Sequence, residues 1–135
     1  KEFAAAQGGR TDVLDQPELL PSCEDRHEVR SETSGVVTAI DAEQVGIAAM
    51  LLGAGRETKE SIIDPGAGIV LRKKVGDRVE SGEVLAELHI GKDYKRNVQE
   101  AEAKLRAAVT ISSGDAPEEP LILAIVNKQG VTKWQ

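Results

Sequence analysis

The sequence contains very few aromatic residues. One Phe, one Tyr and one Trp make up 2% of its 135 residues, so the core must be packed from Val, Ile, Leu and Ala. Three rings cannot provide the series of platforms on which the bases of single-stranded nucleic acid stack. Lys and Arg number 17 against 23 Asp and Glu, and the formal net charge of −6 repels polyphosphates. We therefore expect no nucleic-acid partner.

Sulfur chemistry and long apolar runs are also scarce. Cys23 is the one cysteine, so no internal disulfide and no zinc site built from several cysteines can form. A reducing compartment suits such a chain, and we expect a cytoplasmic location. No apolar run approaches the roughly 20 residues that span a bilayer, and the first residues lack the pattern of a signal peptide. We expect no membrane partner.

The residues that are present suit one folded domain with a leading segment. Hydrophobic residues make up 40% and charged residues 30%, which is enough for a core and a solvated surface. Residues 1–7 form an Ala-rich helical segment that Gly8-Gly9 would end, and residues 11–21 show no clear period. We expect residues 1–33 to be the end of a helix and a connector from an upstream domain, as in a piece of something longer. Residues 34–135 would form the domain itself.

The first half of this domain predicts a strand followed by a helix. Residues 35–40 are a β-branched run typical of a strand. Asp41 and Gln44 have the spacing of a capping box, which begins a helix that Gly53 would end. A turn is expected over residues 64–66, because the residue before a proline avoids the helical region.

The second half predicts short strands and one longer helix. From Gly68 the hydrophobic period is two, and glycine turns are expected at residues 75–77 and 81–83 before a strand over 84–90. A helix is expected over 92–108, with its apolar residues at spacings of four and three: Tyr94, Val98, Ala101, Leu105 and Ala108. A short strand at 109–111, a loop at 112–120 and an apolar strand at 121–126, a candidate for a central position, complete the chain.

Single residues offer little catalytic chemistry. Gly53-Ala54-Gly55 lacks the strand before it and the helix after it that a phosphate-binding glycine loop requires. His27 lies in a charged, solvated segment, His89 ends a strand as a packed or edge residue, and neither has a partner carboxylate set by spacing. Cys23 is expected to be a structural or incidental thiol. We expect no catalytic residue and no metal site.

Residues 75–88 resemble the hammerhead motif of lipoyl and biotinyl domains, in which two glycine turns fold strands over each other. Lys92 falls near the position of the lysine that such domains modify. That lysine stands at the tip of a β-hairpin, whereas here a helix is expected to begin. A swinging-arm carrier domain is therefore the alternative interpretation, and shared β architecture is the preferred one.

A longer set of motifs resembles the C-terminal domain of pyrimidine-nucleoside phosphorylases, the family that includes thymidine phosphorylase. The helix that ends Leu51-Leu52-Gly53-Ala54-Gly55-Arg56-Glu57-Thr58-Lys59, followed by Asp64-Pro65 and Gly68-Ile69, carries the resemblance. Ser34-Gly35-Val36-Val37 and Lys74-Val75-Gly76-Asp77 extend it, and it weakens after Lys92.

The resemblance implies an α+β fold of the α/β-hammerhead type, in which a bent β unit is packed by helices. It implies a parent transferase that uses phosphate as co-substrate, needs no cofactor, and converts a pyrimidine nucleoside into base and pentose 1-phosphate. The binding residues of that family lie in segments absent here, namely a helical domain and a phosphate-binding part. These segments would be the partners of this chain, and the parent would be a homodimer.

The residues that match the family motif are expected to order a loop or contact the missing domains rather than react: Gly53, Gly55, Arg56, Glu57, Thr58, Lys59, Asp64 and Pro65. We therefore expect an interdomain packing domain that is inactive alone. A third possibility, a regulatory module that binds an anion at this loop, would require binding that Arg56→Ala abolishes.

Overall fold

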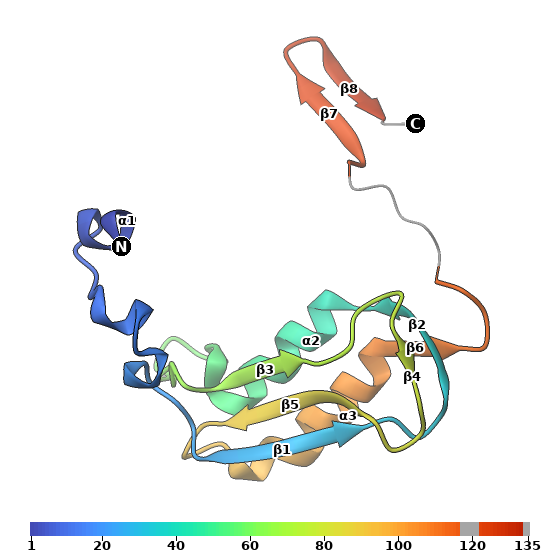
Figure 1. Cartoon of the computed structure of the whole chain (residues 1–135), viewed down its shortest axis with the longest axis horizontal. Helices are drawn as coiled ribbons and strands as arrows, with labels where there is room; N and C mark the ends of the chain where they lie inside the picture. Colours follow the sequence, from blue (N-terminus) through green and yellow to red (C-terminus); the bar gives the residue numbers. More distant parts are fainter. Residues whose placement is uncertain (117–121, 134–135) are drawn as a thin grey trace.

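The computed structural model describes residues 1–116 and 122–133, and it shows a mixed α+β fold (Figure 1). In the described part of the chain the sheets are antiparallel. The α-helices are α1 (Glu2–Ala6), α2 (Ala42–Ala49) and α3 (Val98–Ala108). The strands are β1 (Asp25–Arg30), β2 (Gly35–Ile40), β3 (Gly68–Leu71), β4 (Arg78–Val79), β5 (Val84–Ile90), β6 (Val109–Ser112), β7 (Ala124–Asn127) and β8 (Gly130–Lys133). No helix in the described residues is both apolar and long enough to cross a membrane.

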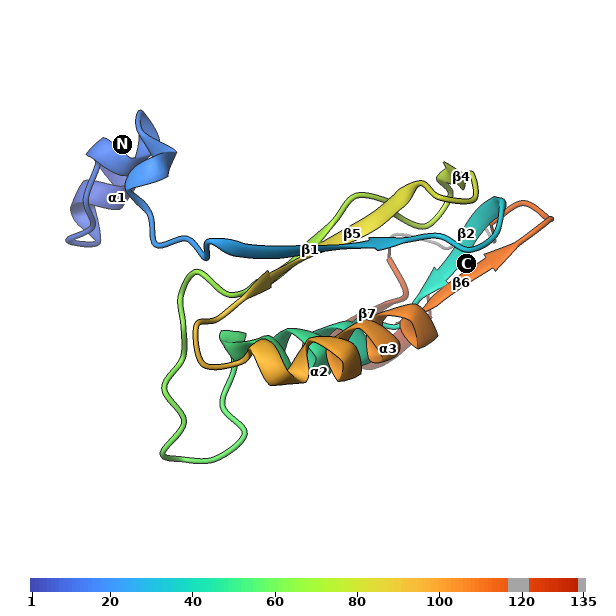
Figure 2. The same cartoon turned by 90° about the horizontal axis from the view of Figure 1, so that it is seen from below.

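The first sheet has the order β1-β5-β3, so the apolar strand β5 lies in its centre. Its inner face packs against α2 and α3, which lie side by side under it (Figure 2). Leu88 of β5, Leu52 beyond α2 and Leu105 of α3 are almost completely buried in the core between these layers. The core is aliphatic, as the sequence predicts.

The second sheet has the order β4-β2-β6 and continues the fold at one end of the first. Val37 of β2, Val79 of β4 and Leu85 of β5 form its smaller core. Strand β5 therefore contributes to both cores, because Leu88 packs in the core of the first sheet and Leu85 packs in the core of the second.

Most local predictions are confirmed. Strands β2 and β5 have the predicted bounds, and the side chain of Asp41 accepts a hydrogen bond from the Gln44 amide at 3.1 Å at the start of α2. The helix predicted over residues 92–108 begins later. Residues 91–94 form a turn and a 3₁₀ turn follows at Lys95–Asn97, so α3 starts at Val98.

Strand β1 was not predicted. Its sequence, Asp25-Arg26-His27-Glu28-Val29-Arg30, is mostly charged, yet it pairs with β5 from Asp25↔Ile90 to Arg30↔Val84. Val29 is fully buried in the first core. The boundary expected between residues 33 and 34 stays a prediction, but β1 lies before it and belongs to the sheet.

The apolar segment at 121–126 does not form a central strand, and that expectation is wrong. Residues 124–127 form β7, which pairs with β8, and every residue of both strands is exposed. Residue 121 and residues 117–120 of the expected loop lie outside the described residues. Strand β8 was not predicted, because a strand of Gly, Val, Thr and Lys has no apolar alternation of its own.

Candidate functional site: the loop that follows helix α2

The end of helix α2 requires glycine at position 53. Helix α2 continues as a π-helical turn at Met50–Ala54. Within this turn Gly53 has φ +105°, a left-handed conformation that L side chains rarely adopt. The Tyr94 ring lies against it, so a Cβ at this position would be 2.7 Å from Tyr94 Cδ2. The first glycine of the family motif is therefore set by backbone conformation and close packing together.

Three successive carbonyls at this helix end accept hydrogen bonds from elsewhere in the chain. Asn97 Nδ2 donates to the Leu51 carbonyl, the Gly91 amide donates to the Leu52 carbonyl, and the Asp64 amide donates to the Gly53 carbonyl, each at 2.9 Å. Carbonyls at a helix end lack partners within the helix. These bonds connect the helix to the start of α3 and close the base of the loop over residues 55–67.

The tip of this loop is open to solvent. Arg56, Glu57, Thr58 and Lys59 are all exposed, and none of the three charged ones joins an ion pair among the described residues. Local bonds shape the tip: the Thr58 amide donates to Ser61 Oγ at 3.0 Å, and the Ser61 amide donates to the Thr58 carbonyl at 3.2 Å.

An apolar side chain extends from the same tip. Ile62 is 83% exposed although its carbonyl accepts a hydrogen bond from the Tyr94 hydroxyl at 3.2 Å. The backbone is thus held by a hydrogen bond, while the Ile62 side chain and the charged side chains of the tip face solvent.

The far end of the loop is a tight turn beside the entry of the chain. Asp64 Oδ1 accepts a hydrogen bond from the Gly66 amide at 2.9 Å, and the Asp64 carbonyl accepts one from the Ala67 amide at 3.1 Å. Pro65 is exposed within this turn, which confirms the turn predicted at 64–66. A Cβ at Gly66 would lie 2.7 Å from the Ser22 carbonyl carbon, so the loop and the entering segment are in contact.

Cys23 follows Ser22 in this entering segment, and its side chain is buried. Burial raises the pKa of its thiol, and the neighbouring carboxylate of Asp64 raises this pKa further. A thiol held in its protonated form is a poor nucleophile. This agrees with a structural role for Cys23.

A hollow of about 410 Å³ lies beside this turn, lined by Ser22, Cys23, Glu24, Asp25, Asp64, Ile90, Lys92 and Lys95. Lys95 and Asp25 close part of it with an ion pair of 2.7 Å. No group of three or more metal-ligating side chains occurs among residues 1–116 and 122–133. The hollow therefore mixes charges of both signs without a converging set of ligands.

Neither histidine belongs to this site. His27 was expected in a solvated segment, but its Nε2 lies 2.8 Å from Glu102 Oε2 and links β1 to α3. His89 is packed in the central strand β5, where it pairs with Arg26 on one side and Gly68 on the other. The expectation of a packed residue is confirmed for His89.

Lys92 is exposed in the turn at residues 91–94, where the Tyr94 amide donates to the Gly91 carbonyl at 2.9 Å. This turn leads from strand β5 into the helical region rather than from one strand of a hairpin to the next. The geometry expected of a swinging-arm lysine is therefore absent at Lys92.

The sequence did not identify Gly91, Tyr94 and Asn97 as partners of the motif loop. The sequence pattern puts Tyr94 on the apolar face of a longer helix, and no motif includes Gly91 or Asn97 as a partner of the loop. Their contacts join residues about forty positions apart, and no local pattern encodes such a pairing.

Comparison with known proteins identifies the family to which this sequence is similar. Residues 36–112 match the family model described as "Pyrimidine nucleoside phosphorylase C-terminal domain". The chain belongs to this family. The matched region begins in β2, ends in β6 and includes the whole of the loop at residues 55–67.

Longer bacterial relatives extend the family match. A pyrimidine-nucleoside phosphorylase of Staphylococcus epidermidis is 43% identical over 118 residues, which are 87% of this chain and 27% of that protein. One of Bacillus subtilis is 42% identical over 128 residues, 95% of this chain and 29% of that protein. One of Staphylococcus aureus is 43% identical over 112 residues, 83% of this chain and 25% of that protein. The chain thus spans somewhat more than a quarter of the length of the first of these relatives.

Proposed function

We propose that this domain is the C-terminal part of an enzyme that splits pyrimidine nucleosides with phosphate, releasing the base and a pentose 1-phosphate. The observation that carries the proposal is the family match at residues 36–112, together with relatives named pyrimidine-nucleoside phosphorylase that are about three times as long as this chain. Phosphate would be the co-substrate, no cofactor is required by this chemistry, and the reactive groups would lie in the rest of the polypeptide. The parent enzyme would be a cytoplasmic homodimer.

The same proposal gives the domain a packing role and an α/β-hammerhead fold. A bent unit of two sheets that share the apolar strand β5 and pack on α2 and α3 supports that fold name. In the packing role the exposed loop at residues 55–67 contacts the phosphate-binding part, and Arg56, Glu57 and Lys59 form ion pairs there. The domain would then move with that part when the cleft closes around substrate.

Activity measurements on two polypeptides test the assignment. The longer polypeptide that carries this domain should release uracil or thymine from the corresponding nucleoside in a phosphate-dependent reaction. The isolated chain of 135 residues should release neither. Turnover by the isolated chain, or none by the longer polypeptide, would contradict the proposal.

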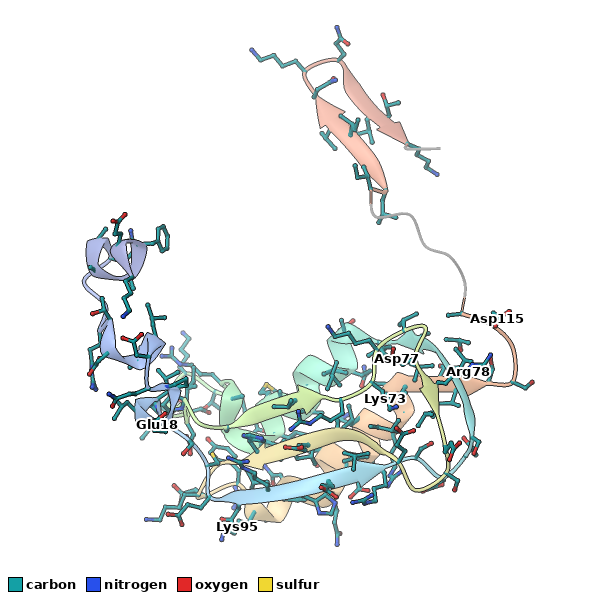
Figure 3. All side chains as sticks on the ribbon, viewed as in Figure 1. Glu18, Lys73, Asp77, Arg78, Lys95 and Asp115 are labelled. Carbon is teal, nitrogen blue, oxygen red and sulfur yellow. The ribbon has the colours of Figure 1, made fainter. Side chains whose placement is uncertain are left out.

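Charge removal in the loop tests the packing role. Arg56→Ala with Lys59→Ala should lower kcat of the longer polypeptide about tenfold or more, because the cations would lose partners made during closure. The free energy of unfolding of the isolated chain should not change, since both side chains are exposed and unpaired among the described residues. Arg78→Ala is the control, because Arg78 lies at the end of the molecule opposite Lys95, which lines the hollow beside the loop (Figure 3).

A further inference from the structure

The hairpin of β7 and β8 exposes apolar side chains that nothing in the described structure covers. Val126 and Val131 are directly opposite each other across the two strands, and they are 75% and 70% exposed. Lys133 lies on the same face, because residues two apart on a strand point to the same side. The face formed by Val126, Val131 and Lys133 is named here the valine face.

A hairpin of this kind is poorly stabilised while it is exposed. Two strands without a third element are marginal in water, and apolar cross-strand pairs stabilise a sheet mainly when they are buried. Neither strand contains a proline, and Lys133 is the one charged residue within the two strands. Lys133 and the short length of both strands protect their edges, but they leave the pair of valines uncovered. The valine face therefore calls for a covering surface.

Strand β7 lies in a region of sequence that is matched by a relative much longer than this chain. The Bacillus subtilis protein matches 128 of the 135 residues, which leaves seven residues of this chain outside the alignment. Strand β7 ends at Asn127 and so lies within the match. The matched region is 29% of that protein, so most of that polypeptide lies outside the match. A remainder of this size would offer a large surface to which the hairpin can bind.

Charge argues against two hairpins covering each other. Residues 122–133 contain Lys128 and Lys133 and no Asp or Glu, so this segment carries +2 within a chain of −6. If two valine faces packed together, the lysines of both copies would lie beside the apolar contact. Neither hairpin contains a carboxylate that could pair with them. A surface that is apolar in its centre and acidic at its rim fits better.

We propose that the β7–β8 hairpin is a docking arm whose valine face binds an apolar, acid-rimmed surface on the remainder of the same polypeptide. The inference rests on the proposed function, because that function supplies the remainder. The hairpin would hold the domain to the rest of the enzyme independently of the loop at residues 55–67.

Hydrogen exchange measured by mass spectrometry tests the docking arm. Amides of residues 124–133 should exchange slowly in the longer polypeptide and fast in the isolated chain. Val126→Thr with Val131→Thr in the longer polypeptide should reduce this protection about tenfold or more, because β-branched side chains are kept while apolar contact is lost. Gln129→Ala, in the exposed turn between the strands, is the control and should leave protection unchanged.

The other results would overturn the inference. Fast exchange in both polypeptides means that nothing covers the hairpin. Protection in the isolated chain means that the hairpin binds its own domain, or a second copy if the protection depends on concentration. Protection that survives both threonine substitutions means that another face is bound. Phosphorolysis measured on the same samples separates these failures from failure of the proposed function.

Discussion

At the scale of single residues, glycine is required where backbone and packing coincide. Gly53 combines a left-handed backbone with contact to the Tyr94 ring, and it lies in the turn that follows α2, at the base of the family loop. Gly46 lies in the interior of α2, and apart from its chain neighbours and the backbone of its own helix no heavy atom lies within 4 Å of where its Cβ would be. The structure therefore requires glycine at position 53, whereas it leaves room for a side chain at position 46.

Alanine substitutions at these two glycines should have effects of opposite sign. Gly53→Ala should lower the free energy of unfolding by about 1–3 kcal/mol, because an L residue is strained there and its Cβ meets Tyr94. Gly46→Ala should raise it by about 0.5–1 kcal/mol through helix propensity. Denaturant unfolding of the isolated chain measures both, and equal effects would contradict the assigned conformation of Gly53.

At the scale of elements, side-chain bonds connect the edge strand β1 to helix α3. The Glu102 carboxylate of α3 accepts a hydrogen bond from His27 of β1 at 2.8 Å and two from the Arg106 guanidinium at 2.9 Å and 2.7 Å. Arg106 also donates to the Arg30 carbonyl at 2.7 Å. Burial raises the pKa of the Glu102 carboxyl, but the bonds from Arg106 and His27 outweigh it and hold this pKa below its ordinary value of 4.5. Ionised Glu102 therefore stabilises the folded state.

The stabilisation by Glu102 should depend on pH with a definite sign. Because its pKa is lower in the folded state, the contribution is present at neutral pH and is lost as the pH falls below 4.5 and through the folded pKa. Glu102→Gln should lower the free energy of unfolding by about 1 kcal/mol at pH 7. The difference from the unsubstituted chain should shrink on acidification, as measured by urea unfolding between pH 7 and pH 3.

Glu100 gives the matched control for this pH dependence. It lies in the same helix, is exposed, and joins no ion pair among the residues that the structure describes. Glu100→Gln should leave the pH profile of stability unchanged. A difference for Glu102→Gln that stays constant down to pH 3 would mean that the carboxylate is not the stabilising group.

At the scale of the whole molecule, the packed body begins at the entry to β1. The first buried residue is Cys23, and the exposed large hydrophobics before it are Phe3, Leu14, Leu19 and Leu20. Val29 of β1 has no exposed surface. Residues 1–20 therefore contribute less to stability than strand β1 does, although the sequence pattern predicts one connector over residues 1–33.

Two deletions separate these contributions. Removal of residues 1–20 should change the free energy of unfolding by less than about 0.5 kcal/mol, because no residue of that segment is buried. Removal of residues 1–33 should cost more than about 3 kcal/mol, since it exposes the Val29 site and leaves β5 without a partner on one side. Thermal unfolding followed by circular dichroism compares the two, and equal stabilities would restore the domain boundary at residue 34.

The sequence by itself determined the features that depend on near neighbours in the chain. The cap at Asp41, the turn at residues 64–66 and strand β5 follow from bonds and periods that span a few residues, and the family motif marked the loop after α2. Tertiary structure decided the rest, because long-range pairing outweighs local preference. Strand β1 exists because β5 offers it a hydrogen-bonding edge, and Tyr94 and Asn97 serve the loop because folding brings them to the end of α2.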